Sequence, residues 1–171
     1  MFTEITKCRI CGNSDLIPIL SLGEQYLTGI FPKNKDTNIT LGPLELVKCR
    51  DDQNGQFCGL LQLKQSYDLD EMYGFNYGYR SGLNQSMVNH LQKKVENICS
   101  LVSLHKGDLI IDIGSNDSTL LQSYPKNKFA LVGIDPTGKK FQDYYPASIK
   151  LIPAFFSSKI IEEHFGCKKA K

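Results

Sequence analysis

The chain has 171 residues, of which 41% are hydrophobic and 22% charged, so it can form one ordinary domain or a small domain joined to part of a larger one. Its formal net charge of +2 is nearly neutral and its basic residues are spread along the sequence, which argues against nucleic acid as a partner. No apolar run approaches the ~18 residues that cross a bilayer, and the start MFTEITKCRICG does not resemble a signal peptide. We therefore expect a cytoplasmic protein with no membrane partner.

Four of the six cysteines have a spacing that suits a metal. Cys8 and Cys11 lie in CRICG, a knuckle whose glycine lets the backbone turn around an ion. Cys49 and Cys58 flank the polar loop RDDQNGQF, whose Asn54-Gly55 turn can bring the two sulfur atoms together. They predict a structural zinc site in a module over residues 1–66, which is too small to be held by apolar burial alone. The alternative is a redox CxxC dithiol with two buried thiols.

Residues 67–105 are expected to connect this module to the rest of the chain. The stretch YDLDEMYGFNYGYR at 67–80 alternates aromatic residues with others and contains glycines that interrupt a helix, which predicts a loop or short extended segment. Its rings either pack on a neighbouring face or line a site. From Leu83 to about Leu104 apolar residues recur at helical spacing, which predicts one amphipathic helix with Cys99 buried among apolar neighbours.

The last segment, residues 106–171, alternates apolar runs with helical patterns. The runs at 109–113, 129–134 and 150–152 predict three strands. One helical pattern begins at Thr119, after the first strand. Another follows the third strand and contains Ile160, Ile161 and Phe165. Strands that alternate with helices predict an α/β fold with a parallel, Rossmann-like sheet.

The residues that follow the first two strands predict a nucleoside site. Gly114 lets backbone approach a ligand at the carboxyl end of the first strand, and a following helix offers free N–H groups. Asp135, 23 residues after Asp112, can accept hydrogen bonds from both ribose hydroxyls. The binding sites of NAD and FAD contain the motif G-x-G-x-x-G, which is missing here. In addition, Asp112 and Asp117 would repel phosphate groups. Both features favour a cationic cofactor without phosphate, such as S-adenosylmethionine. A plain strand-turn-helix without a ligand is the alternative.

Five segments together resemble the sugar C-methyltransferase family: CRICG, CGLLQL at 58–63, MYGFNYGYRSGLNQSMVNHL at 72–91, DIGSNDSTLL at 112–121 and GIDPT at 133–137. The resemblance implies a small four-cysteine zinc-binding module followed by the first three strands of a class I S-adenosylmethionine-dependent methyltransferase. The implied zinc ligands are Cys8, Cys11, Cys49 and Cys58. The implied cofactor contacts are Gly114, Ser115, Asn116 and Asp117 at the methionine part and Asp135 at the ribose. Tyr77 and Tyr79 would lie near the cofactor and the sugar.

The reaction that the resemblance implies is methylation of the carbon beside the keto group of a nucleotide-linked 4-ketohexose, with the nucleotide-sugar as substrate partner. The family's histidine base follows the third strand at some distance, and no residue of this chain matches it, so the catalytic residues are unknown. His90 belongs to an earlier motif and is not assigned that role.

Three departures from the family pattern lead to further expectations. Ser118 replaces the last glycine of the loop, Ala154 stands where an acidic residue commonly contacts adenine, and the later strands are absent. We expect the isolated chain to be inactive, with an apolar sheet edge that needs a complementing C-terminal chain. One alternative is a zinc-stabilised, non-catalytic interaction module with a vestigial nucleoside site. A nucleotide-sugar dehydrogenase or epimerase is disfavoured by the missing second glycine.

Overall fold

The computed structural model describes the whole chain except residues 28, 51–54, 56 and 75–76. The chain divides into two compact units, Met1–Gly78 and Tyr79–Lys171, which are described separately below as unit 1 and unit 2. None of the helices that the described residues form is both long and apolar enough to cross a membrane.

Unit 1 consists mostly of antiparallel strands. β2 (Leu16–Tyr26), β3 (Leu41–Cys49) and β4 (Leu61–Leu63) form one sheet in that order, while β1 (Phe2–Glu4) pairs with β5 (Gln65–Tyr67). The short helix α1 (Leu69–Tyr73) follows, capped by the Asp68 side chain, which accepts from the backbone N–H of Glu71. Few apolar side chains are buried here: the described ones are Cys8, Ile30, Val47 and Cys49. Apolar burial therefore contributes little to the stability of unit 1.

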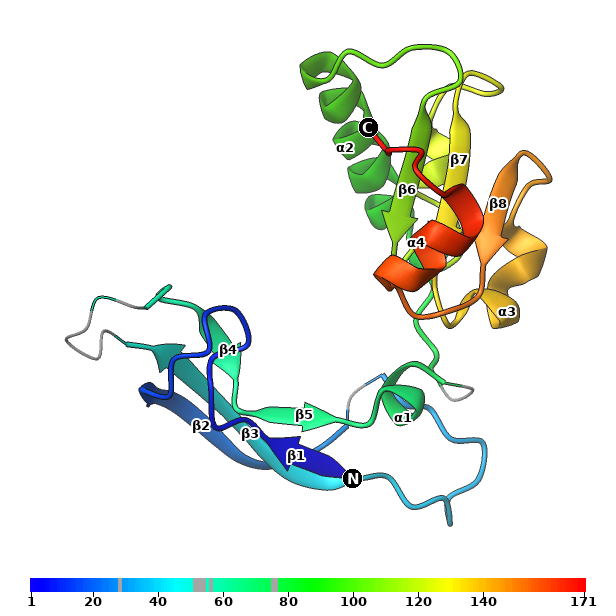
Figure 1. The fold of residues 1–171 in the computed structure, drawn as a ribbon. Coiled ribbons are helices and arrows are strands. Elements are labelled where there is room, and N and C mark those ends of the chain that lie inside the picture. The colour runs from blue at the N-terminus through cyan, green and yellow to red at the C-terminus, as the bar shows by residue number, and fades with distance from the viewer. Residues whose placement is uncertain (28, 51–54, 56, 75–76) are drawn as a thin grey trace. The chain divides into compact units, whose positions relative to one another are not determined.

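Unit 2 contains the predicted parallel sheet. β6 (Leu109–Ile113), β7 (Ala130–Ile134) and β8 (Ile149–Ile152) pair in the order β6-β7-β8, all parallel. Helix α2 (Gln85–Leu101) lies on one side of the sheet and α4 (Ser158–Phe165) on the other, as Figure 1 shows. The short elements are η1 (Ser81–Leu83), η2 (Leu121–Ser123), α3 (Gly138–Phe141) and η3 (Gln142–Tyr144). The fold is mixed α/β, and the expected parallel arrangement is confirmed.

Each face of the sheet in unit 2 has its own apolar core. On the α2 side, Val95 packs with Ile110, Leu131 and Ile149 and with the η2 residues around Leu121. On the α4 side, the core consists of Leu109, Val132, Ile134 and Ile152, against which Ile160, Ile161 and Phe165 pack. Two covered faces explain why the strands read as nearly continuous apolar runs.

Two details of the helix prediction are wrong. The helix begins at Gln85 and not at Leu83, because the Asn84 side chain accepts from the backbone N–H of Ser86 and caps the helix there. Leu83 lies outside the helix and is 69% exposed. Cys99 is exposed as well, because only one side of α2 faces the sheet.

The helix expected from Thr119 is reduced to the single 3₁₀ turn η2. Tyr124 is already extended, with ψ 151°, because it precedes Pro125 and the proline ring disfavours helical backbone in the residue before it. Tyr124 lies only five residues after Thr119, so a regular helix has no room.

Candidate functional site

The four cysteines Cys8, Cys11, Cys49 and Cys58 come together in unit 1. The Sγ atoms of Cys8 and Cys58 lie 3.5 Å apart, as do those of Cys11 and Cys49, and all four lie within 4.8 Å of one another. Four sulfurs arranged tetrahedrally around zinc at about 2.3 Å would be about 3.8 Å apart, so the cluster fits the ion. The predicted grouping of these residues is confirmed.

Local backbone structure holds each half of the cluster. The backbone N–H of Gly12 donates to the carbonyl of Cys8, and the N–H of Cys8 donates to the carbonyl of Asn13. Gly12 has φ +75°, a conformation that glycine adopts without cost. Cys49 ends β3 and donates its N–H to the carbonyl of Leu60. The Cys8 knuckle is a turn and does not begin a helix, so it lacks the setting of a redox CxxC motif. The Asn54 side of the predicted turn lies outside the described residues.

The thiols of Cys8 and Cys58 have strongly different pKa values. Hydrogen bonds from the backbone N–H groups of Cys11 and Ile10 lower the pKa of Cys8 to about 6. The backbone N–H of Leu60 lowers the pKa of Cys58, but desolvation and the sulfurs of Cys8 and Cys11 outweigh it and raise that pKa to about 11. Several thiolates so close together repel one another, so full ionisation of the cluster requires a cation.

At the carboxyl end of β6, Gly114 is open to a ligand. It has φ +75°, its N–H donates to the carbonyl of Ile134, and a Cβ built on it would meet no atom within 4 Å. Ser115, in contrast, is buried, and its hydroxyl lies 2.8 Å from the Tyr145 hydroxyl. Room for Ser115 comes from Gly133 of β7, where an added Cβ would lie 2.5 Å from the Ser115 Oγ. Of these two neighbours, only Gly114 offers a free surface.

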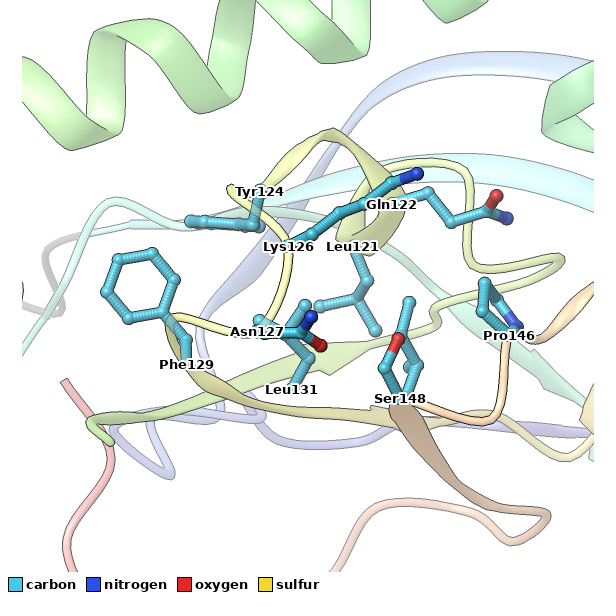
Figure 2. A pocket seen from close by; sticks show the side chains of 10 residues that line it. Leu121, Gln122, Tyr124, Lys126, Asn127, Phe129, Leu131, Pro146 and Ser148 are labelled. Atoms are coloured by element: carbon cyan, nitrogen blue, oxygen red, sulfur yellow. The ribbon is translucent and has the colours of Figure 1, made fainter. Parts of the chain in front are cut away.

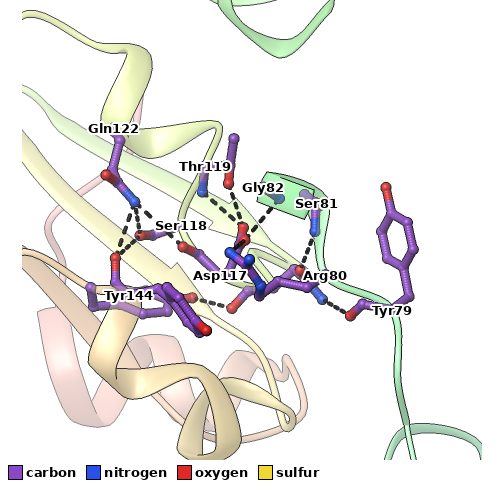
Figure 3. Close-up of polar contacts among 11 residues, drawn as sticks. Tyr79, Arg80, Ser81, Gly82, Asp117, Ser118, Thr119, Gln122 and Tyr144 are labelled. Atoms are coloured by element: carbon purple, nitrogen blue, oxygen red, sulfur yellow. Dashed lines mark hydrogen bonds and ion pairs between the residues drawn. The ribbon is translucent and has the colours of Figure 1, made fainter. Parts of the chain in front are cut away.

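Asp117 binds other parts of unit 2 and is only 1% exposed. Its Oδ2 accepts from the backbone N–H of Gly82 at 2.8 Å and from Arg80 Nη1 at 3.2 Å, and its Oδ1 accepts from Thr119, as Figure 3 shows. The Arg80 guanidinium also lies 4.1 Å above the centre of the Tyr144 ring. This network, formed by Arg80, Gly82, Asp117, Thr119 and Tyr144, is called the Asp117 network below.

Asn116 connects the same loop to residues 79–81 and to Asp135. Its Oδ1 accepts from the backbone N–H of Ser81, and its Nδ2 donates to the carbonyl of Tyr79. Its own backbone N–H donates to Asp135 Oδ2 at 2.7 Å, while Thr137 donates its N–H and its hydroxyl to Oδ1. Asp135 is 6% exposed, and its Oδ2 accepts from one described donor while Oδ1 accepts from two, which leaves an acceptor position on Oδ2. Its role at the ribose stays a prediction.

Sequence reasoning missed Arg80, Tyr144 and Tyr145. Their partners in the loop are between 26 and 37 residues away, and no periodic pattern reports such a contact. The available signal was charge: Arg80 is the one arginine or lysine between Lys64 and Lys93. The two tyrosines expected near a substrate fall in different units. Tyr77 of unit 1 pairs with Ile30 and packs against Tyr73, and Tyr79 of unit 2 is exposed.

A cavity of about 590 Å³ lies on the sheet of unit 2 at some distance from Gly114. Figure 2 shows Leu121, Tyr124, Phe129 and Leu131 around it, with Pro146 and Ser148 on the other side. Residues 126–129 and 146–148 precede β7 and β8, so the cavity lies near the amino ends of these strands. Gly114 lies at the carboxyl end, so this cavity is not part of the predicted nucleoside site.

Asp112, in β6, carries a carboxylate that costs stability. Burial and the nearby Asp135 raise its pKa to about 6 from 3.8, against an opposing effect of Lys94, and no described residue donates a hydrogen bond to it. The folded chain therefore binds more protons than the unfolded one between about pH 4 and 6, and stability falls as the pH rises through this range. The cost at about pH 7 is about 2 to 3 kcal/mol.

We expect Asp112→Asn to stabilise unit 2 by about 2 kcal/mol at about pH 7 and by much less below about pH 4, where both folded and unfolded Asp112 are neutral. Urea unfolding at several pH values measures this difference. A gain of the same size at every pH would show that the carboxylate charge is not its cause.

Ser118 adopts a backbone conformation that suits glycine. Its φ is +64°, and its hydroxyl donates to the Tyr144 carbonyl while accepting from Gln122 Nε2. Both Ser118→Ala and Ser118→Gly lose these bonds, but only glycine relieves the strain, so we expect the Gly variant to be more stable than the Ala variant by about 1 kcal/mol. Denaturant unfolding measures both. The same pair of variants at Ser123, in η2, should show the opposite order, and the prediction fails if the two sites behave alike.

The described residues define a chain of mixed α/β class with a four-cysteine cluster that could hold a metal ion and, further along the chain, a parallel sheet with a glycine loop. Residues 8–73 match the family described as "Putative zinc binding domain". The chain is also 29% identical to the C-methyltransferase NovU of Streptomyces niveus over 161 residues, which cover 93% of this chain and 37% of that protein. Both findings confirm the resemblance to C-methyltransferases with a zinc-binding module, for a chain that spans little more than a third of the relative's length.

Proposed function

We propose that this chain supplies the zinc-binding unit and the first three strands of the cofactor domain of an S-adenosylmethionine-dependent C-methyltransferase, which acts on a nucleotide-linked keto-sugar. The similarity to NovU supports the reaction type. The parallel order β6-β7-β8, with a glycine loop directly after β6, supports a Rossmann-like domain.

The observation that carries the cofactor proposal is the open surface at Gly114 beside carboxylates. Gly114 has no atom within 4 Å of an added Cβ, so a ligand can contact its backbone. Asp112 lies two residues before it with no described hydrogen-bond donor, and Arg80 is neutralised by Asp117. This charge pattern suits a cationic sulfonium with a ribose and disfavours a pyrophosphate.

In this proposal the cofactor supplies an electrophilic methyl group, and the residues of the chain bind and orient it. Gly114 contacts it through the backbone, and Asp112 provides a negative charge near the sulfonium. Ser115, Asn116 and Asp117 hold the loop in place from within, and the proton acceptor is not assigned. All three histidines, His90, His105 and His164, are exposed.

The outer edge of β6 offers a place for a complementing segment or chain. No strand formed by the described residues pairs with that edge, although the backbone N–H of Lys171 donates to the Leu109 carbonyl. We propose that turnover requires this chain together with such a segment. In the order β6-β7-β8, strand β6 lies at the edge of the sheet, so the cleft beside it has strands on one side only.

An NMR titration of the ¹⁵N-labelled chain with S-adenosylhomocysteine tests the cofactor site, because shift changes report even weak binding. We expect changes in the amides of 113–116, their loss in Gly114→Ala, and no changes of this size with NAD⁺. Gly107→Ala is the matched control: Gly107 has φ +89° and open space around its Cβ position, and it lies at the other end of β6. Changes that persist in Gly114→Ala would contradict the proposed site.

A second candidate function is a zinc-stabilised, non-catalytic interaction module. The observation that favours it is the internal use of the loop's polar groups, since Asp117 and both oxygens of Asp135 already accept hydrogen bonds from unit 2. A chain that binds zinc but shows no shift changes with S-adenosylhomocysteine would select this function.

A further inference from the structure

Two carboxamide side chains donate N–H groups to sulfurs of the cysteine cluster. Gln62 Nε2 donates to the Sγ of Cys8 at 3.3 Å, and Asn13 Nδ2 donates to the Sγ of Cys49 at 3.5 Å. Gln62 is 7% exposed and Asn13 9%, so water does not compete freely for either amide.

Backbone groups fix the orientation of both amides. Gln62 Oε1 accepts from the backbone N–H and the guanidinium of Arg9, and Asn13 Oδ1 accepts from the backbone N–H of Asp15. An N–H group can only donate, so each oxygen must face it and each NH₂ group must face its sulfur. Arg9 also donates to the carbonyl of Gln65 and to the Ser66 hydroxyl, which ties Gln62 to β5.

Such bonds matter when the cluster is loaded, because four thiolates around Zn²⁺ carry a formal net charge of about −2. A hydrogen bond from a neutral amide withdraws negative charge from a sulfur without removing it from the metal. The two sulfurs that receive these bonds belong to the buried cysteines, Cys8 and Cys49. Cys11 and Cys58 are exposed, and no described side-chain amide donates to them.

We propose that Asn13 and Gln62 are positioning residues for the zinc site, which protect Cys8 and Cys49 and leave Cys11 and Cys58 as the pair through which metal is lost and electrophiles attack. This inference rests on zinc binding by the four cysteines. The site is then asymmetric. Buried amides anchor the sulfurs of Cys8 and Cys49, whereas Cys11 and Cys58 are open to solvent.

The test compares zinc transfer from the loaded full chain to a chromogenic chelator in three variants. Gln62→Met removes the N–H at similar volume and is expected to release zinc about 10-fold faster than wild type. Gln62→Glu keeps an oxygen for Arg9 but places negative charge beside Cys8, so its release should be faster still. Gln65→Met is the matched control. Gln65 is also buried in unit 1, but its Nε2 donates to the carboxylates of Glu4 and Glu45 and not to a sulfur. The Gln65→Met variant should therefore release zinc at the wild-type rate.

Two further readouts separate positioning from a loss of folding. In the Co²⁺-loaded chain, the sulfur-to-cobalt charge-transfer band should move to lower energy in Gln62→Met and stay in place in Gln65→Met. Limited alkylation with mass mapping should label Cys11 and Cys58 first among the four cluster cysteines in wild type, with Cys8 joining them in Gln62→Met, while the exposed thiols Cys99 and Cys167 outside the cluster react in every variant. Unchanged release and band position in Gln62→Met, with zinc bound, overturn the role of Gln62. A wild-type chain that binds no zinc overturns the zinc proposal itself and this inference with it.

Discussion

Chelation of zinc is expected to unfold unit 1 while unit 2 keeps its own unfolding transition. Two of the four described buried apolar residues of unit 1, Cys8 and Cys49, are themselves members of the metal cluster. A core of this size contributes at most about 3 to 5 kcal/mol, whereas a structural zinc contributes on the order of 10 kcal/mol in small modules. The metal therefore decides whether the unit folds.

Calorimetry and far-UV circular dichroism, with and without EDTA, measure this effect. The matched variants are Cys49→Ser, which removes one of the four sulfurs, and Cys99→Ser, which removes an exposed thiol of α2 that lies outside the cluster. Cys49→Ser should behave like the chelated chain, and Cys99→Ser like the untreated one. A unit 1 that melts at the same temperature with and without metal would refute the structural role of zinc.

The cysteine site could be predicted because metal ligation depends on residue identity more than on packing. The spacing of Cys8 and Cys11 indicates a metal-binding knuckle. Cys49 belongs to the same cluster although it is 38 residues away from Cys11 in the sequence. The sheet of unit 2 could be predicted too, since β6 and β7 are buried on both faces and their apolar runs show it.

The interior of the glycine loop could not be predicted in the same way. Asp117 and Ser115 look like ligand-binding residues in sequence, because small polar residues after a strand are typical of such loops. The partners that the structure shows for them, Arg80 and Tyr145, come from segments that approach only in the folded unit, and their role at a ligand stays a prediction. The pattern shows where a loop lies, but it does not show whether the side chains face a ligand or the protein.

The shape of the loop depends on the Asp117 network, so its removal should be costly. Asp117→Ala leaves Arg80 without its ion pair and leaves the backbone N–H of Gly82 and the hydroxyl of Thr119 without an acceptor. Removing one member of a buried ion pair typically costs about 3 to 5 kcal/mol, because the partner charge remains unpaired. We expect a loss of this size in urea unfolding of unit 2.

Two comparisons make that prediction specific. Asp143→Asn neutralises an exposed acid in η3, near Tyr144 in the sequence, and should change stability by less than about 0.5 kcal/mol. Arg80→Met combined with Asp117→Asn should cost less than the sum of the two single variants, since the double variant leaves no unpaired charge behind. Additive losses, or a loss below about 1 kcal/mol in Asp117→Ala, would mean that the loop is held elsewhere. The coupling matters for the loop, because Asp117 is 1% exposed and its carboxylate ties residues 115–118 to Arg80 and Gly82.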